Sequence, residues 1–222
     1  VLNREANKNK PDILVSAFIQ QNKYSIDKIV PSTEAMTWVH GKLYKASFLK
    51  ENNIRFPDKV RLNEDGSFNT MAFGLTKNIF RTSTITTLWV DNKNSLTRKD
   101  KDFAVTCLPS YIDGQIFAFN FLMDKQVENS NGLSAGIIFI YNYYQVLLDY
   151  SVYPDDELED KIRKFLNRVN DKGYFKDEAF VKNLMEVNHE KKNSNGYEYF
   201  ESQTFKQWLE LYGVILDENN SN

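Results

Sequence analysis

One stretch decides how the first half of the chain is interpreted. It covers residues 38–69 and runs WVHGKLYKASFLKENNIRFPDKVRLNEDGSFN. It predicts a Gly-Lys-Leu-Tyr turn, an amphipathic helix over residues 45–53, and an extended exit before Pro57, because the residue before a proline avoids the helical region. Near its end lie the adjacent acids Glu64 and Asp65, which favour a helix start. A loop-borne acidic pair beside basic and aromatic groups is suited to general-base chemistry.

The residues around this stretch predict a small sheet. Residues 13–19 are an apolar run rich in β-forming residues and predict a buried strand, and residues 24–30 predict an edge-like one. Residues 67–75 predict a helix with Phe68, Met71 and Ala72 turned inward, and the β-branched residues 84–90 predict a further strand. Two or three strands are few for a self-sufficient α/β domain, so we expect the front portion to be half of a larger fold.

The pattern changes near residue 100. Helices are predicted over residues 111–128, 133–150, 154–170 and 177–187, with a polar loop over residues 188–196. A last helix is indicated by one apolar face: Phe205, Trp208, Leu209 and Tyr212. The predicted fold class is therefore an α/β front portion, residues 1–100, followed by an all-α C-terminal domain, residues 101–222.

Charge is divided unevenly between these two portions. Residues 1–100 contain 16 basic and 10 acidic residues, whereas residues 101–222 contain 12 and 20. A basic front portion suits an anionic ligand such as a nucleotide or a phosphate group. The alternative is that both portions carry ordinary solvated surfaces.

Composition excludes several classes of protein. The single cysteine, Cys107, rules out an internal disulfide and indicates a reducing compartment, so we expect a cytoplasmic protein. The most apolar stretch, residues 133–153, is interrupted by Asn142, Gln145 and Asp149, so we expect no transmembrane segment. The acidic pI of about 5.8 and the lack of a basic aromatic motif disfavour nucleic-acid binding.

Taken in order, several segments resemble the second half of the catalytic domain of family 2 glycosyltransferases, which have a GT-A fold. The resemblance covers about residues 10–100. Its pieces are residues 12–16 (DILVS), Trp38, residues 41–44 (GKLY), 48–49 (FL), 53–57 (NIRFP), 63–65 (NED) and 95–98 (SLTR). Residues 101–222 look like the variable helical extension that often follows such domains.

The resemblance implies transfer of a sugar from a nucleotide-sugar donor to the hydroxyl of a glycan or similar acceptor, with inversion at the anomeric carbon. It makes Asp65 the base that removes the acceptor's proton and Glu64 a residue that orients the loop or the acceptor. It assigns donor or acceptor contacts to further positions: Trp38, Lys42, Tyr44, Thr97 and Arg98. A surface lysine and a packed tyrosine explain Lys42 and Tyr44 nearly as well.

The same resemblance implies a divalent cation, Mn or Mg, in the intact enzyme. The family's Asp-x-Asp metal motif lies in a nucleotide-binding half that should precede residue 13, and only residues 100–102 fit its letters, at the wrong place. We therefore expect a missing N-terminal half. His40 is a candidate metal ligand, although a lone histidine is more commonly structural.

Two further expectations follow from an incomplete front portion. The alternative function is a non-catalytic glycan-binding or assembly module derived from a glycosyltransferase. An exposed sheet edge would also invite pairing with a second copy, giving a homo-oligomer.

Overall fold

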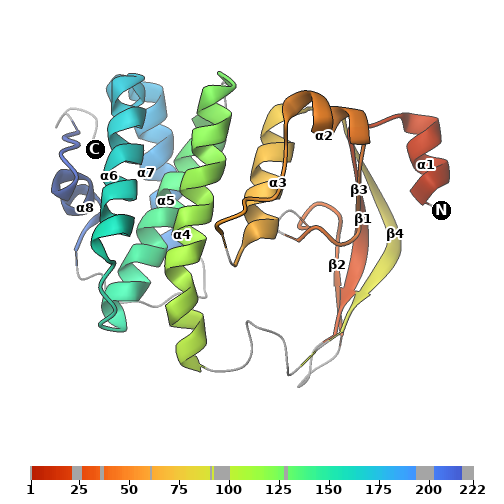
Figure 1. Ribbon diagram of the computed structural model, residues 1–222, viewed down its shortest axis with the longest axis horizontal. Helices are drawn as coiled ribbons and strands as arrows, with labels where there is room; N and C mark the ends of the chain where they lie inside the picture. The colour runs from red at the N-terminus through yellow and green to blue at the C-terminus, as the bar shows by residue number, and fades with distance from the viewer. Residues whose placement is uncertain are drawn as a thin grey trace. The chain divides into compact units, whose positions relative to one another are not determined.

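The computed structural model describes residues 2–21, 27–35, 38–60, 62–90, 92, 101–127, 130–193 and 203–216 (Figure 1). The chain divides into two compact units, residues 1–101 and 102–222. The first unit contains a small sheet with helices, and the second unit is helical. At this level the predicted order, an α/β front portion followed by helices, is confirmed.

The sheet is built around β1 (Ile13–Gln20). On one edge β1 pairs in parallel with β4 (Ile79–Trp89) over its whole length. Its other edge pairs antiparallel with β2 (Lys28–Val30) at one end and β3 (Lys42–Tyr44) at the other. The first six residues of β1 are buried, which explains why this strand is a continuous apolar run rather than an alternating one.

One prediction in this unit was wrong. The Gly-Lys-Leu-Tyr segment was expected to be a turn, but Lys42–Tyr44 is strand β3. Its three residues pair with the start of β1, so tertiary pairing decides the conformation of a segment too short to show a period. The turn itself is supplied by Gly41, whose φ of 71° lies in the left-handed region.

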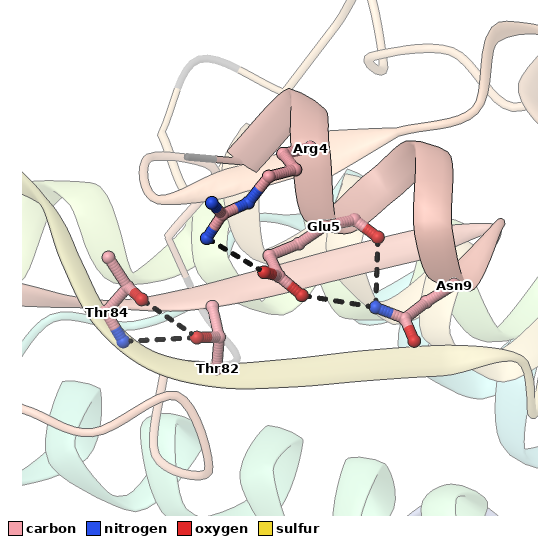
Figure 2. Close-up of polar contacts among 5 residues, drawn as sticks. All are labelled: Arg4, Glu5, Asn9, Thr82 and Thr84. Carbon is pink, nitrogen blue, oxygen red and sulfur yellow. Dashed lines mark hydrogen bonds and ion pairs between the residues drawn. The ribbon is translucent and has the colours of Figure 1, made fainter.

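β4 is longer than predicted and is irregular. Its pairing with β1 slips twice, since Ser16 pairs with Thr82 and the next residue of β1 pairs with Ile85, followed by Thr87. At the first slip the backbone N–H of Thr84 donates to the hydroxyl of Thr82 at 3.2 Å (Figure 2). The Thr82 hydroxyl thereby gives the Thr84 N–H a hydrogen-bond partner where the strand pairing is interrupted.

In the described part of the first unit, three helices accompany the sheet. They are α1 (Leu2–Asn9), α2 (Ala46–Asn52) and α3 (Glu64–Leu75). In α1 the Asn9 amide donates to the Glu5 carbonyl at 3.0 Å, one turn back (Figure 2). In α3 the inward residues are those predicted from the sequence: Phe68, Met71 and Ala72.

The second unit contains longer helices than the sequence predicted. The helix expected from residue 111 begins ten residues earlier and includes Pro109, because loss of one backbone donor is tolerated within a 24-residue helix. The helix expected to end at residue 187 continues, since Val181, Leu184 and Asn188 are buried at helical spacing. The elements are α4 (Lys101–Asp124), α5 (Ser130–Asp149), α6 (Asp156–Asp171), the 3-10 turn η2 (Tyr174–Lys176), α7 (Glu178–Asn193) and α8 (Phe205–Leu211).

The core of the second unit is aromatic and closely packed. Trp208 of α8 is fully buried, and its ring lies 5.5 Å from that of Tyr141 in α5. Gly136 of α5 allows the ring of Phe119 in α4 to approach its backbone, where a Cβ would overlap the ring. Within the described ranges, no helix has the length and apolarity to cross a membrane.

Candidate active site

The predicted base lies in the first turn of α3. Glu64 and Asp65 are both half-buried, and Asn63 before them adopts the left-handed conformation with a φ of 64°. The Oδ2 atom of Asp65 accepts from the backbone N–H of Val39 at 3.4 Å, which is a long contact. This contact links α3 to the turn that precedes β3.

That turn is fixed to the sheet through Gly41. The Gly41 carbonyl accepts from both the backbone N–H and the hydroxyl of Ser16, each at 2.8 Å. Ser16 belongs to β1 and is fully buried. A Cβ on Gly41 would lie 3.1 Å from the Ser16 hydroxyl, so the position has little room for another residue.

Lys42 is buried, with only 9% of its surface exposed, and it interacts electrostatically with Asp65. Its ammonium donates to the backbone carbonyl of Trp38. Burial lowers the pKa of Lys42 from 10.5 to about 8, the Asp65 carboxylate opposes this shift, and the Arg81 guanidinium adds to it. The ammonium is therefore held between one negative and one positive group.

Tyr44 and Asn69 form the next layer of contacts. The Tyr44 hydroxyl donates to Oδ1 of Asn69 at 2.5 Å. Asn69 lies four residues after Asp65, so both side chains belong to one face of α3. Burial raises the pKa of Tyr44, and the charge of Asp65 acts in the same direction. The phenol therefore stays protonated and remains a donor.

His40 belongs to an aromatic group with Phe18, Trp38 and Trp89. Its ring lies 4.5 Å from Phe18, 5.9 Å from Trp38 and 6.1 Å from Trp89, measured between centroids. Burial lowers the pKa of His40, and Lys42 acts in the same direction against Asp65, so the imidazole is neutral at pH 7. Its Nε2 atom is buried and has no hydrogen-bond partner in the described part of the chain.

The described residues offer no evident site for the expected metal ion. They contain no group of three or more His, Cys, Asp or Glu side chains that could hold a metal ion. A ligand role for His40 and the Mn or Mg ion therefore stay predictions, and no chemical step below depends on them.

The structure brings together most of the residues singled out in the sequence. Asp65 acts electrostatically on His40, Lys42 and Tyr44, and it contacts the residue next to Trp38. Thr97 and Arg98 lie outside the described residues.

The sequence analysis missed two residues of this site. Arg81 was overlooked because β4 was expected to begin only at residue 84; its Nη1 donates to the Ser32 carbonyl at 2.5 Å. Asn69 was overlooked although its spacing of four from Asp65 places both on one helical face. A polar residue at that spacing inside an otherwise buried face was the available signal.

No protein-family model matches the chain, and no curated protein sequence matches it. Chains of solved structures do match, among them the crystal structure of S. aureus TarS residues 1–349 in complex with UDP, at 12% identity and a TM-score of 0.47. That match covers 92% of this chain and 65% of the TarS chain. At this TM-score we base no conclusion on the likeness.

Proposed function

We propose that the chain is the acceptor-side part of an inverting glycosyltransferase. The donor is a nucleotide sugar and the acceptor is a hydroxyl of a glycan or similar molecule. The observation that supports this proposal is the position of Asp65: a half-buried carboxylate at a helix N-terminus, next to the turn that carries Trp38 and His40 and to strand β3, which begins at Lys42. The order of the sequence motifs supplies the reaction class.

In the proposed reaction Asp65 accepts the proton of the acceptor hydroxyl. The acceptor oxygen forms a bond to the anomeric carbon of the donor while the bond from that carbon to the phosphate oxygen breaks. The nucleoside diphosphate leaves with the electron pair of the broken bond. A hydroxyl is a poor nucleophile in water, so a positioned carboxylate is worth roughly 10²–10⁴ in rate.

The neighbouring groups suit this role for Asp65. The N-terminus of α3 and the Lys42 ammonium both place positive charge near the Asp65 carboxylate. The Tyr44 hydroxyl donates its hydrogen bond to Asn69, so it does not compete with the acceptor hydroxyl for Asp65. Glu64 is one residue away and is proposed to orient the loop or the acceptor.

The test uses the full-length protein that contains this chain, incubated with a panel of nucleotide sugars and hydroxyl acceptors. Released nucleoside diphosphate is measured for the wild type and for Asp65→Asn. The amide keeps the acceptor for the Val39 N–H but is not a base, so we expect the rate to fall by about 10²–10⁴. Asp58→Asn is the matched control, because Asp58 is exposed and lies on a loop of the same unit.

The two functions left open by the sequence give different results. If Asp65→Asn folds with an unchanged circular dichroism spectrum and transfers sugar at the wild-type rate, the proposed base is wrong. If the wild type binds glycans but releases no nucleotide with any donor, the non-catalytic module is the correct function.

A further inference from the structure

The side chain of Lys42 is buried and hydrogen-bonded within the protein. It is 9% exposed, and its ammonium donates to the carbonyl of Trp38, four residues back in the chain. It pairs with Val15 across the sheet, and Arg81 pairs with the same residue from the other edge. Because paired residues share a face of the sheet, Lys42 and Arg81 flank Val15 on one face.

The turn between Trp38 and Lys42 is held at both ends and in the middle. Gly41 is bonded to Ser16 of β1, and the Trp38 carbonyl is bonded to Lys42. Between these two points the Val39 N–H faces Asp65 at 3.4 Å. A displacement of the Trp38 carbonyl therefore also moves the neighbouring Val39 N–H, which donates to the Asp65 carboxylate.

Charge reinforces this arrangement. Lys42 is influenced by Asp65 of α3, which attracts its ammonium, and by Arg81 of β4, which repels it. His40, on the same stretch as Lys42, is neutral, and Tyr44 is a protonated phenol. Among the described residues, Asp65 is the anion whose charge raises the pKa of Lys42, and it attracts the ammonium that Arg81 repels.

We propose that Lys42 is a positioning residue for Asp65: it holds the 38–41 turn through the Trp38 carbonyl and attracts the carboxylate, and it does not contact either substrate. This inference rests on the proposed transferase function. It replaces the expectation, taken from the sequence, that Lys42 contacts the donor or the acceptor.

The first test measures catalysis in the full-length protein. In Lys42→Met we expect kcat to fall roughly 10–100-fold, because a misplacement of about 1 Å at a reacting group has an effect of this size. The KM values for donor and acceptor should change less than twofold. Lys42→Arg should recover part of kcat, since a guanidinium can also donate to the Trp38 carbonyl and attract Asp65. A direct substrate contact would instead raise the KM of one substrate, and that result would overturn the proposal.

The second test does not need activity. The chain is labelled with nitrogen-15 and 5-fluorotryptophan, and the Val39 amide and the Trp38 fluorine resonances are recorded. We expect both to shift in Lys42→Met and to stay near their wild-type positions in Lys42→Arg. Trp208, buried in the second unit, should not shift and serves as the internal reference. Lys59→Met, at an exposed lysine of the same unit, is the matched control.

The two tests separate the failure of the two proposals. A wild-type protein without transferase activity would refute the proposed function, whereas the resonances would still report whether Lys42 holds the turn. Unchanged Val39 and Trp38 resonances in a folded Lys42→Met protein would overturn the inference. If Lys42→Met does not fold, Lys42→Gln replaces it, since glutamine keeps a donor but removes the charge. A lower kcat in the glutamine variant with wild-type resonances supports the role of the Lys42 charge. A glutamine variant that keeps both the wild-type kcat and the wild-type resonances would overturn that role.

Discussion

The stability of the first unit should depend on pH through Lys42. Burial lowers the pKa of this lysine in the folded chain from 10.5 to about 8. In the unfolded chain the ordinary value is restored, so between pH 8 and pH 10.5 the unfolded chain binds a proton that the folded chain has released. Stability therefore rises with pH across this window, and the cost of burying the ammonium is fully present below pH 8.

The size of the effect follows from the two pKa values. At 1.36 kcal/mol per pH unit, the whole window corresponds to about 3 kcal/mol. Between pH 7 and pH 9.5, which is the range convenient for experiment, it amounts to about 2 kcal/mol. Residual solvent screening reduces this value, so we expect about 1–2 kcal/mol.

The measurement compares the wild type with Lys42→Met. Urea unfolding is followed at pH 7, 8, 9 and 9.5 by the fluorine resonance of 5-fluorotryptophan at Trp89 of β4, which reports on the first unit alone. Other groups titrate in both proteins and cancel in the difference. Relative to the variant, the free energy of unfolding of the wild type should therefore rise by about 1–2 kcal/mol between pH 7 and pH 9.5.

The control is Lys59→Met, whose difference from the wild type should not change with pH because Lys59 is exposed. A difference between wild type and Lys42→Met that stays flat from pH 7 to pH 9.5 would refute the reasoning. It would mean that the Lys42 ammonium is hydrated in solution and is not buried against the Trp38 carbonyl.

Three further changes have defined outcomes in the second unit. Gly136→Ala forces a Cβ into the Phe119 ring, and thermal unfolding should show a loss of about 1–3 kcal/mol. Asp155→Ala removes the side chain that caps α6, so urea unfolding should show a loss of about 1 kcal/mol, whereas Asp155→Asn should lose less. Burial raises the pKa of Tyr144 to about 12, so the folded chain keeps a proton that the unfolded chain loses above pH 10, and stability falls there. Tyr144→Phe should make that fall shallower, and an unchanged slope would contradict the assignment.

The sequence predicted those helices and strands whose own residues carry a clear hydrophobic pattern. β1 was recognised because five of its first six residues are apolar, and α3 because Phe68, Met71 and Ala72 recur at helical spacing. β3 was missed because its three residues acquire their conformation only by pairing with β1. The extension of α7 past residue 187 was missed because Asn188 is polar, although its position is buried.

The candidate site was predictable as residues but not as an arrangement. The sequence singled out Asp65, Lys42 and Tyr44, yet it offered no distance between α3 and the strand that carries the other two. Their proximity depends on α3 lying over the sheet, which is a tertiary effect. The inward orientation of Lys42 was equally hidden, because a lysine in a short segment is more commonly a surface residue with its ammonium in water.

The second slip of β4 determines where Trp89 lies. Ala17 and Phe18 are consecutive in β1, but their partners Ile85 and Thr87 are two apart, so Thr86 is an inserted residue. An insertion of one residue inverts the in-and-out sequence of every side chain that follows it. The indole thereby shares a side of the sheet with Phe18, next to His40. If Thr86 paired with Phe18 instead, so that the strand ran on without this bulge, Trp89 would face the opposite side and leave the ring cluster, although no residue of that cluster would have changed.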